Sequence, residues 1–160
     1  MPTIKRVLCP VDFTDTAAVA AREAAALARA AGAELLLVHA LSEPWLNPGR
    51  EKGYPAPIAQ QYEMIARCKL AGTADALHQL TRIRPLIVYG PVEEAIADAA
   101  SKHGADVIVM GARTRRGLSK LLADGMTERV MKRARVPVVR VCPTLPRKPP
   151  MGFASPHGTA

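Results

Sequence analysis

Three arginines lie close together in one segment of the sequence, where their guanidinium groups could bind an anion. Arg113, Arg115 and Arg116 stand within the stretch from residue 111 to residue 123. Each guanidinium presents a fork of N–H groups that matches two oxygens of a phosphate. These three side chains therefore make a phosphorylated small molecule one candidate ligand.

The formal charge of +8 is concentrated in the last third of the chain. Residues 111–148 hold eleven Lys and Arg against two acids, whereas the other residues hold eleven against twelve. Anionic partners are considered there, although a solvated helix face followed by a basic tail would give the same excess. Aromatic residues make up only 4% of the chain, and none except Phe153 lies among these cations, so nucleic-acid binding is not expected.

The sequence contains no recognisable catalytic motif. A Ser–His–Asp order, an H-E-x-x-H motif and a Walker lysine motif are all missing, so we expect a protein that is not an enzyme, with a weak ATPase left open. His39 falls in an apolar run and is interpreted as a hydrogen-bonded core histidine. Cys9, Cys68 and Cys142 lack metal-ligand or CxxC spacing, which predicts buried cysteines in a reducing cytosol and no metal site.

Length and composition predict one cytoplasmic domain. The 160 residues suit a single core, which we place at 1–143, followed by a Pro- and Gly-rich tail at 144–160 that we expect to be disordered. No uninterrupted apolar run approaches the roughly 18–20 residues of a membrane span, and the first residues make a poor secretory signal. We therefore expect a cytoplasmic location without membrane contact.

Apolar runs alternate with helical patterns, which predicts a doubly wound α/β fold with a parallel sheet. The expected strands are residues 4–11, 34–41, 85–89, 106–110 and 137–142. The expected helices are residues 16–31, 58–82, 91–104 and about 124–135, with Gly72 a weak point in the second and a long loop at 42–57 before it. Ligands of such sheets bind outside the carboxyl ends of the strands, so the loops at 10–14, after 41 and at 111–123 are the candidate site.

Three stretches of the sequence resemble the universal stress protein family. They are CPVDFT at residues 9–14, GARTRRGLSKLLADGMTERV at residues 111–130 and ARVPVVRV at residues 134–141. The resemblance covers about residues 3–143. It implies an adenine nucleotide alpha-hydrolase-like fold: a single Rossmann-like, five-stranded parallel sheet with strand order 3-2-1-4-5 and helices on both faces.

The resemblance also implies a homodimer formed through the fifth strand. Val138, Val139 and Val141 make that strand apolar, and an edge strand has free N–H and C=O groups. An edge that is covered by the tail or blunted by Arg140 is the alternative.

A nucleotide site is implied by positions that match the nucleotide-binding branch of the family. In that branch an aspartate after the first strand contacts adenosine, and Asp12 matches it. The nucleotide-binding residues that we predict are Pro10, Val11, Asp12, Ala40, Gly111, Gly125, Met126 and Thr127, together with the arginines Arg113, Arg115 and Arg116. Ala40 would line the adenine, and Gly111 matches the first glycine of the phosphate loop.

Two departures from the family pattern concern the phosphates. Thr114 stands where the family has a second glycine, and Asp124 with Gly125 replaces a glycine followed by a hydroxyl residue. Asp124 is also a good N-cap for the fourth expected helix and could fill the anion position itself. The sequence thus leaves two functions open. One is a dimeric regulatory stress protein that binds AMP, ADP or ATP, with or without Mg²⁺; the other is a dimeric interaction protein whose phosphate site Asp124 closes, with protein partners unknown.

Overall fold

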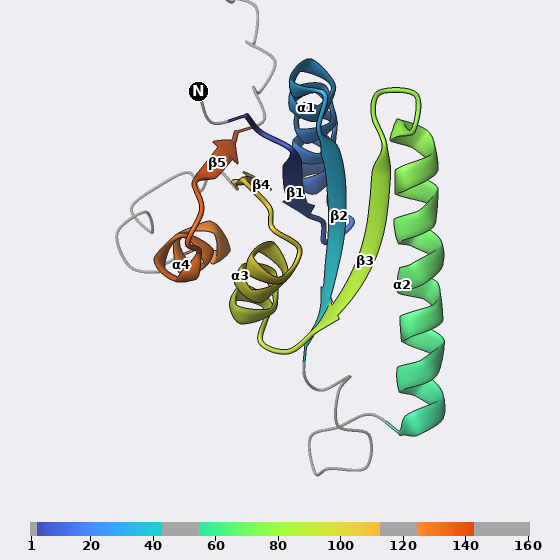
Figure 1. Ribbon diagram of the computed structural model, residues 1–160. Coiled ribbons are helices and arrows are strands. Elements are labelled where there is room, and N and C mark those ends of the chain that lie inside the picture. Colours follow the sequence, from blue (N-terminus) through green and yellow to red (C-terminus); the bar gives the residue numbers. More distant parts are fainter. Residues whose placement is uncertain (1–2, 43–54, 113–124, 143–160) are drawn as a thin grey trace, which may run out of the picture.

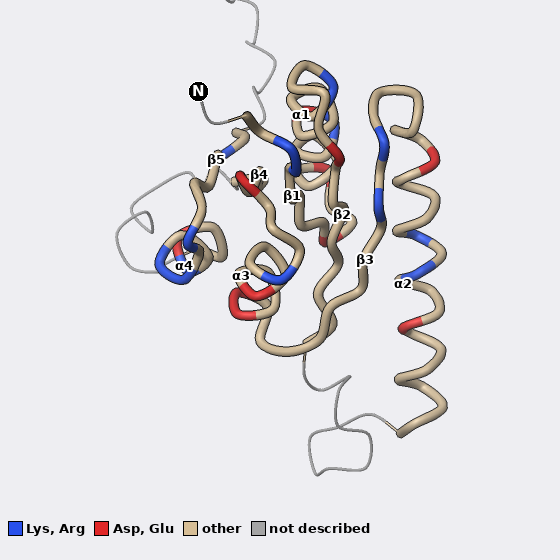
Figure 2. The backbone as a smooth tube through the Cα atoms, in the orientation of Figure 1, with Lys and Arg blue, Asp and Glu red and all other residues tan. Residues whose placement is uncertain are grey.

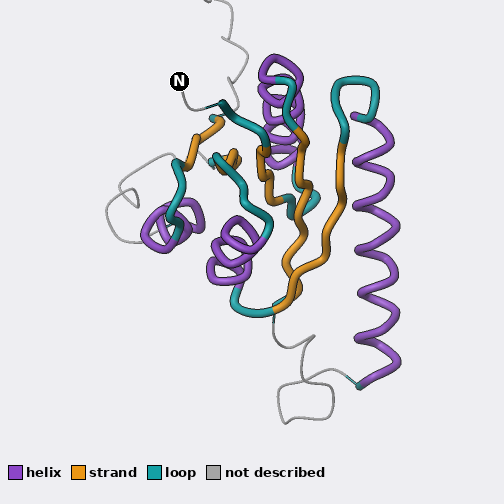
Figure 3. The backbone as a smooth tube through the Cα atoms, viewed as in Figure 1, coloured by secondary structure: helices purple, strands orange, loops and turns teal. Residues whose placement is uncertain are grey.

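The computed structural model describes residues 3–42, 55–112 and 125–142, in which strands and helices alternate along the chain (Figures 1 and 3). The strands are β1 (Arg6–Pro10), β2 (Glu34–Leu41), β3 (Ile83–Tyr89), β4 (Val107–Gly111) and β5 (Val138–Val141). The helices are α1 (Asp15–Ala31), α2 (Ala56–Leu77), α3 (Val92–Lys102) and α4 (Met126–Arg133). The predicted alternation is therefore confirmed.

The five strands form one parallel sheet in the order β3-β2-β1-β4-β5, which confirms the predicted topology. Each face of the sheet carries its own apolar core. Alanines of α1 and leucines of α2 pack on one face, whereas Ile96 of α3 and Val130 of α4 pack on the other. Because β1 and β2 are covered on both faces, their side chains are nearly all apolar, as parallel strands require.

Short polar contacts fix the ends of α1. The Thr14 hydroxyl accepts a hydrogen bond from the Ala17 N–H at 3.3 Å, which is an N-cap contact. Gly32 ends the helix in the left-handed region, at φ 65°, where a glycine is favoured. The chain can then turn directly into β2.

Helix α2 and strand β3 differ from the prediction at their junction. The helix ends at Leu77 instead of Arg82, and β3 begins at Ile83 and continues through Pro85. The Thr81 hydroxyl donates to the Ala33 carbonyl at 2.8 Å, which attaches this turn to the start of β2. Pro85 is acceptable inside β3 because within the described sheet β3 pairs on one side only, and an edge strand tolerates a missing N–H.

The ends of two other helices also differ from the prediction. Pro91 is the N-cap of α3 and precedes its first residue, Val92. Gly125, not Asp124, is the N-cap of α4, and no side chain of residues 3–42, 55–112 and 125–142 caps that helix. The expected N-cap role of Asp124 is therefore wrong, while Asp124 itself lies outside the described residues.

Basic and acidic positions are spread over the strands and helices (Figure 2), and several of their side chains form ion pairs between elements. Glu34, at the amino end of β2, lies within 3.6–3.9 Å of guanidinium nitrogens of Arg6, Arg82 and Arg84. On the other side of the molecule, Arg133 of α4 pairs with Glu94 of α3 at 3.1 Å. None of the helices in the described part of the chain combines the length and apolar character needed to cross a bilayer.

Candidate functional site

The sheet register brings the ends of β1, β2 and β4 to the same edge. Pro10 pairs with Val38 of β2, and Leu8 pairs with Ile108 of β4. The Val11 N–H continues the ladder by donating to the Val38 carbonyl at 2.8 Å. When the two registers are continued beyond the last paired residues, Asp12 falls opposite Ala40 of β2 and Val11 falls opposite Gly111 of β4. The positions that the sequence analysis singled out on three different strands therefore lie together.

Asp12 is exposed at this edge, and one of its oxygens is already in use. Its Oδ1 accepts hydrogen bonds from the Thr14 N–H at 3.1 Å and from the Thr14 hydroxyl at 2.5 Å. Because Thr14 is also the N-cap of α1, Asp12 supports the start of that helix. Its second oxygen, Oδ2, has no hydrogen-bond partner among the described residues and can accept one from a ligand.

Gly111 lies where the end of β4 meets the first turn of α1. A Cβ atom at this position would stand 2.8 Å from both the Thr16 methyl carbon and the Thr16 carbonyl oxygen. Side-chain carbons essentially never approach backbone oxygens so closely, so the contact needs a residue without a side chain. Gly111 therefore has a packing role that does not depend on any ligand.

The start of α4 reaches the same point. Thr127 is 5% exposed, and its hydroxyl lies 3.5 Å from the Gly111 carbonyl as a weak donor. Met126 packs against the core beneath α3. No side chain among the described residues caps α4, and the helix dipole would favour an anion at the N–H groups of its first turn. The structure thus brings Gly125, Met126 and Thr127 next to Gly111.

Several of the residues expected near the phosphates lie outside the described part of the chain. They are Arg113, Thr114, Arg115, Arg116 and Asp124. Residues 43–54 of the long loop expected at 42–57, and the tail at 144–160, also lie outside it, and α2 begins at Ala56 instead of residue 58.

Phe13 and His39 border the site next to Val11 and Asp12. The sequence analysis did not single them out as site residues. Phe13 adopts a positive φ of 62°, which is unusual for a bulky residue, and its ring centroid lies 4.5 Å from that of His39. The His39 Nδ1–H donates to the Val11 carbonyl at 2.7 Å. Its Nε2 is buried and has no partner among the described residues, so the expected hydrogen-bonded core histidine is only half satisfied.

The cysteines differ from the prediction, because only one of the three is buried. Cys9 lies within β1, and burial raises the pKa of its thiol to about 12. A neutral, enclosed thiol is a poor nucleophile although it lies close to the candidate site. Cys68 and Cys142 are exposed, contrary to expectation. No group of His, Cys, Asp and Glu side chains within residues 3–42, 55–112 and 125–142 is arranged to hold a metal ion.

The strand order and the helices on both faces define a doubly wound α/β protein. The sequence of residues 3–141 matches the model of the universal stress protein family, and the chain belongs to that family.

Curated relatives agree with this assignment. Universal stress protein MJ0577 of Methanocaldococcus jannaschii is 26% identical over 86% of this chain and 94% of its own length. A universal stress protein of Thermus aquaticus, encoded in the 3′ region of a QAH/OAS sulfhydrylase, is 34% identical over 86% of this chain and 98% of its own length.

Solved structures share the fold. That of MJ0577 superimposes with a TM-score of 0.73 at 26% identity and covers 88% of this chain and 97% of its own. A universal stress protein solved in complex with cAMP has a TM-score of 0.67 at 21% identity, covering 88% of this chain and 98% of its own. One from Archaeoglobus fulgidus, solved in complex with dAMP, has a TM-score of 0.62 at 22% identity, with the same coverage of both chains.

The packing role of Gly111 predicts a stability loss that needs no ligand. In Gly111→Ala the new methyl group must displace β4 or the first turn of α1, and overpacking of this kind costs about 1–3 kcal/mol of unfolding free energy. Urea denaturation measures it. Gly125→Ser is the matched control, since its Cβ would meet only the end of the flexible Glu128 side chain and serine is a good N-cap. A Gly111→Ala protein as stable as the parent would contradict the packing role.

Proposed function

We propose that this protein is a regulatory universal stress protein that binds an adenine nucleotide at the carboxyl ends of β1, β2 and β4. The observation that carries the proposal is the shared edge of Asp12, Ala40 and Gly111, which follows from the strand register. The cAMP and dAMP complexes of proteins with this fold lend support. Their sequence identity to this chain supports a shared fold, and nucleotide binding by this chain is part of the proposal.

The residues divide between the two ends of the nucleotide. Pro10, Val11 and Asp12 border the adenosine, with the free Oδ2 of Asp12 as the hydrogen-bond acceptor, and Ala40 lies beside the adenine. The phosphate end falls to the following residues: Gly111, Arg113, Arg115, Arg116, Gly125, Met126 and Thr127. Guanidinium groups replace part of the backbone contacts that glycines would supply. Any Mg²⁺ would arrive with the phosphates.

The departures from the family pattern favour AMP or ADP over ATP. If the family's phosphate loop is to form here, Thr114 must take the left-handed conformation of a glycine, which would cost roughly 1–2 kcal/mol. A carboxylate brought to about 4 Å from a phosphate, as Asp124 would be in that loop, would cost on the order of 1–4 kcal/mol between aqueous and partly shielded surroundings. Both costs grow in importance as the phosphate chain lengthens, because more oxygens must be accommodated near them.

A second candidate function is a dimeric interaction protein whose phosphate site is closed by Asp124. It is favoured by two contacts that explain the site residues without a ligand. Asp12 Oδ1 accepts two hydrogen bonds from Thr14, and Gly111 is required by its contact with Thr16. Protein partners would then carry the regulatory role.

We propose a cytoplasmic, non-catalytic protein in either case. Catalysis at the strand ends would need an activated nucleophile, and Cys9 is neutral and fully enclosed.

The edge strand β5 supports a homodimer as part of the proposal. Within the described sheet it pairs only with β4, and Val139 is 45% exposed, which is high for a strand valine. Met131 of α4 is a further exposed apolar side chain. Arg140 pairs with Glu128 at 3.1 Å, so it is turned toward its own subunit's α4 and leaves the strand edge open.

Asp12→Ala is expected to abolish nucleotide binding. Calorimetric titration of the parent with AMP, ADP and ATP should give binding that is tightest for AMP or ADP and that Asp12→Ala lowers beyond detection. Thr14→Ala is the matched control. It also breaks the hydrogen bond between the Thr14 hydroxyl and Asp12, and it removes the N-cap contact and about 1 kcal/mol of stability, but it keeps the carboxylate. Affinity retained in Asp12→Ala, or lost equally in Thr14→Ala, would count against the assigned pocket.

The double substitution Asp124→Gly with Gly125→Ser tests the effect that both candidate functions assign to Asp124. It removes a negative charge and restores a glycine followed by a hydroxyl residue, so ATP affinity should rise by about tenfold or more, equivalent to at least 1.4 kcal/mol. Titration with ATP measures the gain, and Gly125→Ser alone shows how much comes from the hydroxyl. ATP affinity that stays the same or falls would reject closure by Asp124.

Val139→Lys is expected to convert the dimer into a monomer. A charge in the middle of the edge strand opposes apolar contact between two copies of β5. Sedimentation velocity should give a dimer for the parent and a monomer for the variant, and Arg22→Gln, on α1, should remain a dimer. A parent protein that sediments as a monomer would overturn the proposal.

A further inference from the structure

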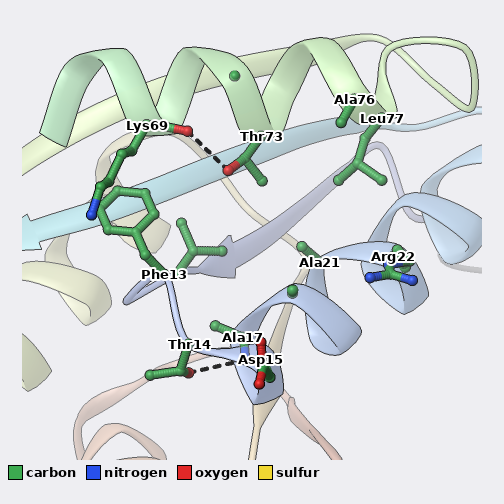
Figure 4. Close-up of a pocket in the computed structure, with 13 residues that line it drawn as sticks. Phe13, Thr14, Asp15, Ala17, Ala21, Arg22, Lys69, Thr73, Ala76 and Leu77 are labelled. Carbon is green, nitrogen blue, oxygen red and sulfur yellow. Dashed lines mark hydrogen bonds between the residues drawn. The ribbon is translucent and has the colours of Figure 1, made fainter. Parts of the chain in front are cut away.

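A cavity of about 500 Å³ that is open to solvent lies between α1 and α2 (Figure 4). It is on the face of the sheet opposite α3 and α4. Its volume falls in the range of small-molecule sites. Val11 is the one lining residue that it shares with the proposed nucleotide site. The cavity is therefore a separate feature that borders the first strand end from the side.

Small residues leave this space open, and Gly72 is the most informative of them. It lies inside α2, where glycine is a poor helix former, and a Cβ at this position would meet nothing within 4 Å. No crowding therefore requires a glycine here. The facing wall on α1 is formed by alanines, Ala17, Ala18 and Ala21, which also leave the space unfilled.

Two cationic side chains, one on each of the two helices, line this apolar space, and neither has an acidic partner among the described residues. Lys69 of α2 extends over the Phe13 ring, with its Nζ 5.6 Å from the ring centroid, and Arg22 projects from α1 (Figure 4). Neither forms an ion pair with any residue that the structure describes. Asp15 is the single acid in the wall, so the cavity carries a surplus positive charge.

One part of the cavity wall is aromatic. Phe13 lines it, and the buried His39 ring lies behind Phe13 at 4.5 Å between centroids. The polar groups of the wall are largely occupied: the Thr73 hydroxyl donates to the Lys69 carbonyl at 2.9 Å, and Thr14 is bound to Asp12. A sugar or another ligand with many hydroxyl groups would find few free partners.

We propose that the cavity between α1 and α2 binds a small organic anion with an apolar, ring-sized body. The body would lie against Phe13 and the alanines of α1, and the anionic group, a carboxylate or a sulfonate, would pair with Lys69 or Arg22. Charge complementarity selects this class of ligand, because the wall offers apolar surface and unpaired cations but few free hydrogen-bonding groups.

Fluorescence titration with 8-anilinonaphthalene-1-sulfonate tests the proposal, since this probe joins an aromatic body to a sulfonate. The native protein should bind it with enhanced, blue-shifted emission. Gly72→Leu should weaken binding by at least about tenfold, because the leucine side chain fills the space. Gly72→Ala is the matched control; it should bind the probe within about twofold of the parent, since a methyl group leaves most of the space open.

Charge variants complete the experiment. Lys69→Gln and Arg22→Gln should each weaken probe binding by about threefold to tenfold, whereas Arg29→Gln, outside the cavity on α1, should not. Thermal melts of every variant show that the fold is retained. A native protein that leaves the probe's emission unchanged, or a Gly72→Leu variant that binds it as Gly72→Ala does, would overturn the proposal. Either result leaves the nucleotide proposal untouched, because no nucleotide takes part.

Discussion

The contact between Gly111 and Thr16 is the constraint on which the rest of the ligand edge depends. It joins the end of β4 to the first turn of α1, with no room for a side chain between them. The carbonyl oxygen of the same glycine lies 3.5 Å from the Thr127 hydroxyl, so the start of α4 is held at the same point. One residue thus fixes how α1, β4 and α4 meet, and a looser junction would separate the carboxylate of Asp12 from the N–H groups of α4.

The turn between β1 and α1 serves two faces of the molecule. Asp12 is exposed at the strand ends, whereas the next residue, Phe13, turns through a positive φ and covers His39 on the α2 side. A strained conformation of a bulky residue persists only when its surroundings hold it in place. The bond from His39 to the Val11 carbonyl and the Asp12–Thr14 bonds supply that support. The proposed nucleotide site and the proposed anion cavity therefore share a wall.

The fold could be predicted from the sequence because its signals are local. The continuous apolar run at 34–41 is buried on both faces as β2, and Gly32 ends α1 where a left-handed residue is needed. Prediction failed at two helix ends. The end of α2 depends on a contact between residues distant in the sequence, Thr81 and Ala33. The N-cap of α4 is Gly125, one residue after the expected Asp124.

The candidate site was predictable in part. Residue matches to the family identified Asp12, Ala40 and Gly111, and the register places them at one edge. The conformation of Phe13 and the cavity beside Gly72 arise from how α1 and α2 pack on the sheet, which no local pattern encodes.

The most direct test of the account is a titration of the ¹⁵N-labelled protein with AMP, followed by amide chemical shifts. The account predicts that the largest changes fall on residues 11–14, 40–41, 111–112 and 125–128, at the joined ends of β1, β2 and β4 and the start of α4. Unchanged spectra at millimolar AMP, or changes confined to the amino edge around Glu34, would contradict it.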